Sequence, residues 1–383
     1  MPKHKLTFHN LGSADCIRID LTNGKKILFD YANMRAEERD DLRCDLPETL
    51  RQDLGDRDYY DVVAFTHLDN DHICGSTSFF RLDFAEAYQS DVDGKKRVEM
   101  REMWVPAAVI TEPLPIDRPD EAKVLQKEAR FRFKQGEGIR VFSRPERLRK
   151  WCEKNDVDFE SRRSIITDAG KVIPGFDKAS DSVEFFAHAP FAHRQDDNSV
   201  EDRNEDSLVV HATFWSGGSE TRLFLASDIG HENLGVILDI SETHGNEDRL
   251  RWDIFKLPHH CSHHAISSQP REGEKSIPEP KVKKLFEDYG EAGCLVVSTS
   301  WPIPAAGSKE DGKNANPPHR QAANYFKEDV VDKTKDFRVT MEHPDTKGPK
   351  PMEIEIDHLG ATVKAIAAPA IASAASSRPP RAG

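Results

Sequence analysis

The sequence predicts an α/β protein in which two β-sheets pack together between outer layers of helices, an αββα four-layer sandwich. Strand-like segments come in runs, and helix-like segments fall between those runs, as expected when helices cover the outer faces of sheets. Residues 59–65 have a continuous rather than alternating apolar pattern, which is typical of a strand buried on both faces. The chain has 383 residues, of which 37% are hydrophobic, and this is enough for a substantial core.

The first part of the chain is rich in short strand-like segments. They are residues 6–8, 16–21, 26–29 and 59–65. The turn signal at Asn23 and Gly24 predicts a hairpin or meander there. Residues 35–54 are charged and are expected to form a surface helix.

Residues 76–180 interrupt this pattern and are interpreted as a largely helical insertion, or cap, over a β-rich core. Helices are expected at residues 121–135 and 145–155, and a strand near residues 105–110. The segment is too long to be a simple loop. We expect it to lie within a single domain that spans residues 1–359.

The β pattern resumes after residue 180. The later strand-like segments are residues 183–187, 207–214, 222–226, 254–257 and 294–298. The helix-like segments among them are residues 231–238, 280–289 and 319–326. Residues 360–383 are of low complexity and are expected to form a disordered tail.

Composition predicts a soluble cytoplasmic protein. The 54 basic and 67 acidic residues give a net charge of −13, which argues against coating nucleic acid by bulk attraction. A local basic groove or a bound divalent metal would still admit a phosphate backbone. The six cysteines are scattered without a CxxC pair, so we expect no disulfide framework. The N-terminal segment lacks the apolar core of a signal peptide, and residues 361–377 are too short and too weakly apolar to span a membrane.

Four potential metal ligands lie within six residues, directly after the strand at residues 59–65. They are His67, Asp69, Asp71 and His72, in the sequence THLDNDHICG. Imidazole and carboxylate groups suit zinc, manganese or iron. Ligands one or two residues apart cannot all face one way on a strand or helix, but an irregular loop lets them converge. The alternative is a solvated acidic turn in which Asp69 or Asp71 caps a helix.

Three later strand-like segments are also followed by a histidine or an aspartate. These residues are His188, Asp228, and the adjacent pair His259 and His260. A single histidine after a strand is more often structural than a ligand. Because several such residues follow strand ends, where a scaffold can hold ligands rigidly, the pattern favours a metal site at one rim of the fold.

These motifs resemble those of the metallo-β-lactamase superfamily, an αββα sandwich of hydrolases with one or two metal ions. The usual first motif is HxHxDH, and here Asp69 stands in place of the second histidine. This departure resembles one branch, the soluble hydrolase domain of ComEC-type DNA-uptake proteins and their stand-alone relatives. Further segments similar to that branch are LGSADCIRI with Asp15, KKILFDYA with Asp30, HAP before NEDSLVV, RLFLASD, LPHHCS with Cys261 in place of glycine, and NPPHRQAANYF with Asn316 and His319. The resemblance covers about residues 5–75 and 183–330.

The resemblance implies a ligand set for two divalent metal ions. The first ion would be held by His67, Asp69 and His188. The second would be held by Asp71, His72 and one of His259 and His260, with His259 slightly favoured, and Asp228 would bridge the two ions. Zn²⁺ is the favoured metal, and Mn²⁺ is the alternative because Asp69 is a harder ligand than histidine.

The same resemblance implies catalytic roles. Asp71 or Asp228 would orient the attacking water and accept its proton, and His319 would donate to a leaving oxygen or a phosphate. For His319 the alternative is a structural position beside a helix capped by Asn316. His263 and His264 fit either an outer-shell role or a solvated turn, and Cys261 is expected to be a small packing residue.

The predicted function is therefore metal-dependent hydrolysis at a dinuclear site, with a phosphodiesterase or nuclease favoured. The segments KEARFRFKQGEGIR and RPERLRK combine basic with aromatic or apolar residues and would suit nucleic acid, but an amphipathic helix with a solvated basic face explains them equally well. The alternatives are a lactonase-type or amidase-type metallohydrolase and a non-catalytic binding protein on the same fold. A phosphoester or nucleic-acid substrate is expected, with no membrane association.

Overall fold

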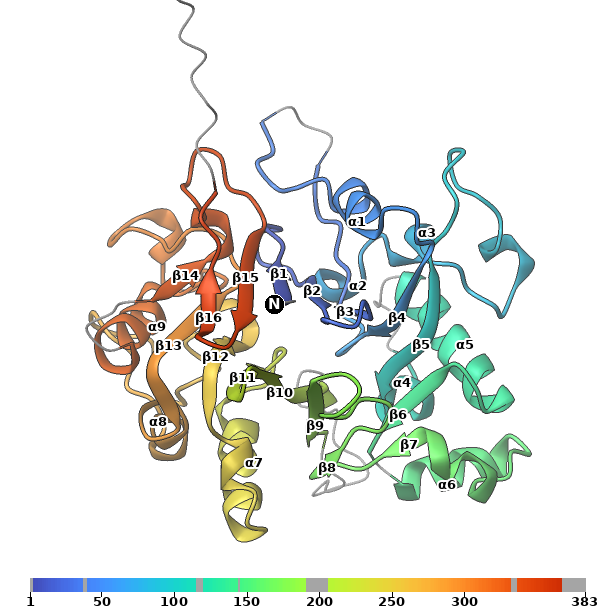
Figure 1. Ribbon diagram of the computed structural model, residues 1–383. Coiled ribbons are helices and arrows are strands. Elements are labelled where there is room, and N and C mark those ends of the chain that lie inside the picture. Colours follow the sequence, from blue (N-terminus) through green and yellow to red (C-terminus); the bar gives the residue numbers. More distant parts are fainter. Residues whose placement is uncertain are drawn as a thin grey trace, which may run out of the picture.

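A computed structural model describes residues 3–36, 40–114, 120–143, 145–190, 206–331 and 336–366. The strands occupy the middle of the molecule. Helices α4, α5 and α6 lie on one side of them, and α7, α8 and α9 lie on the other (Figure 1).

Within the described ranges, nine strands form the first sheet, in the order β16-β15-β1-β2-β3-β4-β5-β6-β7. Their bounds are β1 His4–Phe8, β2 Ile17–Asp20, β3 Lys26–Phe29, β4 Tyr59–Ala64, β5 Glu99–Pro106, β6 Ile139–Phe142, β7 Ile166–Thr167, β15 Met352–Asp357 and β16 Gly360–Val363. Strands β3 to β7 pair in parallel, and Phe29, Ala64 and Trp104 lie side by side in the register. The carboxyl ends of β3, β4 and β5 therefore meet at one edge of the sheet.

The second sheet has seven strands among the residues that the structure describes, in the order β14-β13-β12-β11-β10-β9-β8. Their bounds are β8 Lys171–Val172, β9 Val183–Ala189, β10 Val209–Ser216, β11 Ser219–Leu225, β12 Trp252–Lys256, β13 Gly290–Ser298 and β14 Phe337–Val339. Strands β11, β12 and β13 are parallel, and Leu225, Lys256 and Val297 are neighbours in the register. Their carboxyl ends also share an edge.

The helices begin with α1, Leu46–Leu54, whose N-terminus is capped by the Asp45 side chain accepting from the backbone N–H of Glu48. The others are α2 Asn70–Ile73, α3 Ser76–Phe79, α4 Ala107–Thr111, α5 Asp120–Gln135, α6 Pro145–Lys154, α7 His231–Thr243, α8 Pro280–Glu287 and α9 Arg320–Tyr325. The expected helix over residues 35–54 is thus shorter than its charge pattern suggested. No helix in the described ranges is long and apolar enough to cross a membrane.

Three apolar clusters define the layers. The cluster between the sheets joins Leu6 and Phe29 of the first sheet to Phe185, Leu223 and Ile254 of the second. A second cluster packs α1, α5 and α6 against the outer face of the first sheet. A third packs α7, α8 and α9 against the outer face of the second sheet. The expected αββα four-layer sandwich is confirmed.

Residues 76–180 differ from the expected helical cap. They supply β5, β6 and β7 to the first sheet and β8 to the second, and α4, α5 and α6 form part of its outer helix layer. Met103 and Val141 are buried in the same cluster as Val63 of β4. The segment is therefore part of the core, and its charged helices concealed the three short strands β6, β7 and β8 from the sequence interpretation.

The chain end also differs in part from the expected tail. Strand β16, Gly360–Val363, pairs with β15 inside the segment expected to be disordered. Residues 367–383 lie outside the described residues, as does Asn204 of the NEDSLVV segment.

Candidate metal centre

The candidate site lies where the carboxyl ends of strands from both sheets meet. The loop after β4 runs through Thr66 and carries His67, and the short helix α2 that follows the loop carries Asp71 and His72. The backbone of this loop is fixed by two hydrogen bonds, because Asp15 N–H donates to Asp71 O and Tyr31 N–H donates to His72 O, both at 2.9 Å. Asp228 follows β11, and His260 follows β12.

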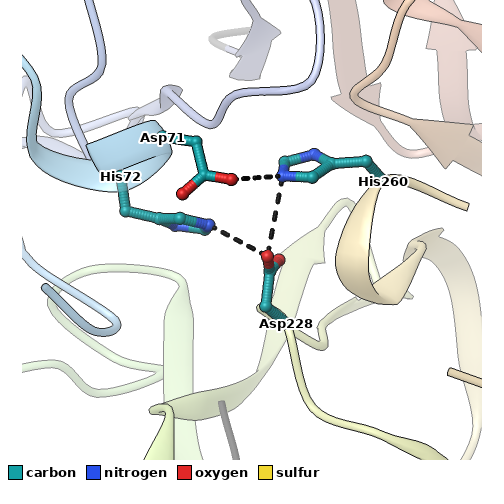
Figure 2. Close-up of side chains that lie close together, drawn as sticks. All are labelled: Asp71, His72, Asp228 and His260. Atoms are coloured by element: carbon teal, nitrogen blue, oxygen red, sulfur yellow. Dashed lines mark ion pairs between the residues drawn. The ribbon is translucent and has the colours of Figure 1, made fainter. Parts of the chain in front are cut away.

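Four side chains converge at this point: Asp71, His72, Asp228 and His260, here called the quartet (Figure 2). One ligand atom from each lies within 4.8 Å of the others. His72 Nε2 is 3.3 Å from Asp228 Oδ2, and His260 Nε2 is 3.4 Å from Asp71 Oδ2 and 3.6 Å from Asp228 Oδ2. The two imidazoles and two carboxylates thus surround one small space.

The opposite nitrogen of each imidazole is fixed from outside the quartet. His72 Nδ1 donates to Asp30 Oδ2 at 2.8 Å, and Asp30 in turn accepts from the N–H and the hydroxyl of Thr66, both at 2.7 Å. His260 Nδ1 donates to the carbonyl oxygen of Thr299 at 2.7 Å. With Nδ1 donating, each ring can present the Nε2 lone pair to the quartet, as metal-ligating histidines do.

The site holds more negative than positive charge. The site contains four carboxylates, those of Asp15, Asp30, Asp71 and Asp228. It also contains one buried lysine, Lys256, which forms an ion pair with Asp15, lies 3.6 Å from Asp228 Oδ1 and donates to the carbonyl oxygen of Ser227 at 3.2 Å. Buried charges are normally paired or bound to metal, so this excess favours a cation in the space.

The electrostatics of the imidazoles agree with this. Burial alone would lower the pKa of His72, but the carboxylates of Asp228 and Asp30 outweigh it and raise the pKa well above its usual value. Asp228 and Asp71 likewise overcome burial and raise the pKa of His260. The carboxylates therefore attract positive charge into the quartet, either as protons on the imidazoles or as a metal ion.

The residues fit a divalent metal. Within the described part of the chain, His67 Nε2, His72 Nε2, His260 Nε2 and Asp228 Oδ1 are buried without a hydrogen-bond partner. A buried polar atom without a partner costs free energy, and several such atoms close together are typical of metal ligands. Two imidazole nitrogens and two carboxylates form a donor set typical of Zn²⁺ or Mn²⁺.

Two of the expected ligands, His67 and Asp69, lie beside the quartet. The His67 ring centroid is 3.9 Å from that of His72, and its Nε2 is 3.9 Å from Asp69 Oδ2. Burial lowers the pKa of His67 to about 4, so the ring is neutral near pH 7. The Asp69 side chain is 31% exposed, which leaves it at the rim.

His188, the third ligand expected for the first metal, does not lie with them. Its Nε2 donates to the carbonyl oxygen of Arg249 at 3.0 Å, and its ring stacks on Phe224, with the centroids 5.0 Å apart. Phe224 belongs to the apolar cluster between the second sheet and its helices. The expected position is therefore corrected, because His188 points to the outer face of its strand rather than beyond the strand end.

The adjacent histidines after β12 are also distinguished. His260 joins the quartet, whereas His259, slightly favoured from the sequence, does not. Cys261 has φ +66° and is fully buried, and burial raises the pKa of its thiol to about 12. It is a packing residue, as expected, and not a thiolate ligand.

The hydrogen bonds of His319 argue against a catalytic role. Its Nδ1 accepts from the backbone N–H of His263 at 2.8 Å, so Nε2 carries the proton and donates to the carbonyl oxygen of Ala315 at 3.0 Å. Both nitrogens are thus engaged by backbone, and a structural position is favoured over donation to a substrate. The expected capping by Asn316 is corrected, because the residue at the N-cap of α9 is His319. His263 is similarly held, between Ser276 Oγ and the carbonyl oxygen of Gln269, while His264 is exposed.

Sequence reasoning did not single out Lys256 or Thr299. Lys256 lies among the apolar residues of β12, directly before LPHH, and a charged residue inside such a strand was the available signal. Thr299 acts through its backbone carbonyl, which no side-chain pattern reveals. Asp15 and Asp30 were noticed as motif positions without a role.

No family model matches this chain, and no curated protein matches it. Solved structures that are similar include Tm1679, described as a metal-dependent hydrolase of the β-lactamase superfamily, with a TM-score of 0.38, 12% identity, and coverage of 88% of this chain and 95% of that one. A diphosphatase from the PhnP family has a TM-score of 0.28 and 11% identity over 74% of this chain and 71% of that one. A long-form RNase Z from yeast has a TM-score of 0.34 and 10% identity over 96% of this chain and 50% of that one. At these TM-scores and identities, the likenesses assign neither a substrate nor a mechanism to this chain.

Proposed function

We propose that this protein is a metal-dependent hydrolase that cleaves phosphodiester bonds, with the metal held by Asp71, His72, Asp228 and His260. The observation that carries the proposal is the quartet itself, in which both imidazoles face one space with Nε2 while Nδ1 is fixed from outside. Simple ion-pairing would not require this orientation of both rings. Metal ligation does.

We expect one firmly bound ion rather than two. The ligands inferred for the second metal converge, but of those inferred for the first only His67 and Asp69 lie nearby, because His188 faces the outer helix layer. Zn²⁺ suits the mixed nitrogen and oxygen donors best, and Mn²⁺ is the alternative. Held by the quartet, an ion of either kind would polarise a phosphoryl oxygen and would lower the pKa of a water molecule toward neutrality.

The exposed fractions of the quartet's side chains indicate their different roles in the reaction. The Asp71 side chain is 33% exposed, whereas those of Asp228 and His260 are 3% exposed. Asp71 is therefore the carboxylate of the quartet that an attacking water and a substrate can reach, and it is the candidate proton acceptor. Asp228 lies between His72 and Lys256, and these two contacts fix the orientation of its carboxylate.

The choice of phosphodiesters is supported by the sequence. The aspartate at position 69 and the segments around Asp15, Asp30 and Cys261 resemble the soluble hydrolase domain of ComEC-type DNA-uptake proteins. Lactone and amide hydrolysis remain the alternatives that the experiment below tests.

The test combines elemental analysis of the purified protein with hydrolysis of bis-p-nitrophenyl phosphate in the presence of added Zn²⁺ or Mn²⁺. We expect about one tightly bound metal per chain and metal-dependent turnover. Asp71→Ala should reduce turnover by about 10²–10⁴-fold. His188→Gln serves as the control and should leave metal content and turnover unchanged, because His188 lies outside the quartet.

The outcomes separate the alternatives. Bound metal with no phosphodiester turnover would redirect the assignment to lactones, amides and other esters. Failure to bind metal even after reconstitution would rule out the metal centre and leave a binding protein as the better account. Unchanged turnover in Asp71→Ala would show that this carboxylate is not part of the reaction.

A further inference from the structure

A cavity lies in the outer helix layer of the first sheet, apart from the quartet. Its volume is about 660 Å³, and its walls come from the end of α4, the middle and end of α5, and α6. These three helices lie together on one side of the molecule, across the strands from α7, α8 and α9 (Figure 1). A volume in this range suits a ligand about the size of a nucleotide.

The lining is strongly basic. It contains five cationic side chains and one carboxylate, Glu112, which is itself in an ion pair with Arg147. The cationic residues are Arg130, Lys134, Arg147, Lys150 and Lys154. This stands out in a chain with a net charge of −13, and it makes the cavity a local site of attraction for anions.

The lysines of the cavity differ from those on the opposite helix layer. Lys134, Lys150 and Lys154 are exposed, and none has an ion pair with a carboxylate in the described part of the chain. By contrast, Lys281 of α8 pairs with Asp239, and Lys284 pairs with Glu242 at 2.7 Å. The cavity therefore concentrates cations that the fold itself does not neutralise.

Two further side chains make the cavity a shaped site rather than a loose surface patch. Arg130 is half-buried, and its guanidinium donates to the carbonyl oxygens of Ile110 at 2.9 Å and Glu112 at 3.3 Å, so its orientation is fixed. The Trp151 ring packs edge-on against Phe133, with the centroids 5.9 Å apart, and Lys134 Nζ lies 5.5 Å from its centre. Fixed guanidinium, flexible ammonium groups and an aromatic wall together suit phosphates joined to a planar base.

The helices of the cavity are tied to the segment that carries Asp71 and His72. Glu121, at the start of α5, accepts from the N–H of Gly75 at 2.8 Å and from the hydroxyl of Thr77 at 2.8 Å, both just after His72. Helix α4 begins where β5 ends, and Phe65 N–H, two residues before His67, donates to Trp104 O of β5 at 2.9 Å. A ligand in the cavity is therefore held by elements packed directly behind the metal loop.

We propose that this cavity binds a nucleotide unit of a single-stranded nucleic acid, as a substrate-positioning site. The class of ligand rests on the proposed phosphodiesterase function, whereas the existence of an anion site rests on the cavity alone. Its size admits one nucleotide at a time and excludes a duplex. Of the first basic segment noted above, Phe133 is a core residue and Arg132 is buried in an ion pair with Glu128, so only Arg130 and Lys134 of that segment line the cavity, together with residues of α6.

The test is fluorescence anisotropy with a labelled oligothymidylate of about a dozen nucleotides, in a chelator so that no cleavage occurs. The double variant Lys150→Gln/Lys154→Gln should weaken binding about tenfold or more and should reduce the slope of log affinity against log salt by about 1.4, since each lost phosphate contact removes about 0.7. Trp151→Phe should weaken binding without changing this slope. The matched control Lys281→Gln/Lys284→Gln removes the same charge from α8 and should bind as wild type does.

A second measurement separates this site from the catalytic proposal. The lining of the cavity contains no residue of the quartet, so the Lys150 and Lys154 double variant should hydrolyse the small substrate bis-p-nitrophenyl phosphate at the wild-type rate. If the wild-type protein binds the oligonucleotide but does not hydrolyse bis-p-nitrophenyl phosphate, the proposed phosphodiesterase function is wrong, but the proposed nucleotide site stands. Equal oligonucleotide affinity in wild type and the double variant would overturn the site, whatever the activity. If polyglutamate competes for the site as effectively as unlabelled oligonucleotide does, and Trp151→Phe has no effect, the cavity is a general cationic patch. Those two results together would also overturn the proposal.

Discussion

His259 and His260 are adjacent in the sequence, but their surroundings give them different chemistry. Both have positive φ, at +47° and +53°, so the chain turns sharply here and directs the two rings apart. His260 is anchored by Thr299 and faces Asp71 and Asp228, whereas His259 is outside the quartet. We expect His260→Ala to lose the bound metal and at least about 10²-fold in turnover, and His259→Ala to retain the metal. Elemental analysis of both variants checks this, and metal loss confined to His259→Ala would reverse the assignment.

Lys256 gives a second prediction at the residue scale. It is fully buried with Asp15 and Asp228, so Lys256→Met leaves two buried carboxylates without their cation. Removing one partner of a buried ion pair costs about 3–5 kcal/mol, and we expect a loss of that order in the free energy of unfolding in urea. The double variant Asp15→Asn/Lys256→Met removes one charge of each sign and should recover part of the loss. Equal stability of Lys256→Met and wild type would show that the lysine does not offset these carboxylates.

The sequence was more informative about candidate site residues where a motif fixes several of them at once. His67 and Asp69 lie on the loop after β4, Asp71 and His72 lie in the short helix α2 that follows it, and all four lie at or beside the quartet. It was less informative for isolated histidines, since the side of a strand that a ring faces depends on register. His188 illustrates this, because it lies on the outer apolar face of β9, whereas its neighbour Ala187 faces the cluster between the sheets.

At the scale of elements, Asp30 joins two parallel strands at the site. It follows β3, and its carboxylate accepts from the backbone of Thr66 after β4 and from His72 Nδ1. Asp30→Asn keeps the shape but weakens the acceptor for His72. We expect a 10–100-fold loss of metal affinity, measured by competition with a chromophoric chelator, because groups behind a ligand contribute about that much.

The same two strands provide the control for this prediction. Asp61 of β4 accepts from the backbone N–H of Lys26 at 2.8 Å, at the opposite end of the β3–β4 pair. Asp61→Asn should therefore leave metal affinity unchanged. Equal losses in both variants would mean that strand pairing in general, and not the Asp30–His72 bond, sets the affinity.

Segment 76–180 shows where element prediction was limited. The charged helices α5 and α6 were visible from composition, and their expected positions agree with those observed. The strands β6, β7 and β8 were missed because β6 has only four residues and β7 and β8 have only two each. Arg140 in the middle of β6 further hid the burial of this strand. The ion pair with Glu102 that makes the buried arginine tolerable forms only in the folded sheet.

For the molecule as a whole, the two-sheet architecture was predictable because each sheet buries one apolar face against the other. Runs such as VVAF and LFLA report that burial directly, and both belong to described strands or their ends. The pairing order of the strands was not predictable, because β15 and β16 return from the end of the described chain to extend the sheet beside β1. Such long-range pairing leaves no local pattern in the sequence.

The buried histidines outside the quartet predict how the metal-free protein responds to acid. Burial, first among the causes, lowers the pKa of His188 to about 4 and that of His211 to about 3, whereas both titrate near 6.5 when unfolded. Between these values the unfolded chain binds more protons than the folded one, so stability is present above pH 6.5 and falls as the pH drops toward 4. His72 and His260 have raised pKa values and act in the opposite sense, losing their contribution as the pH rises above 6.5. The loss of stability below pH 6.5 therefore comes from the neutral histidines, each of which contributes a slope of up to about 1.4 kcal/mol per pH unit to the free energy of unfolding.

Urea unfolding from pH 6.5 to 4.5 should show this slope. His188→Gln should remove the contribution of one histidine, and His259→Ala, at a half-buried position, should remove less. A slope unchanged by His188→Gln would mean that other groups take up the protons when the protein unfolds in acid.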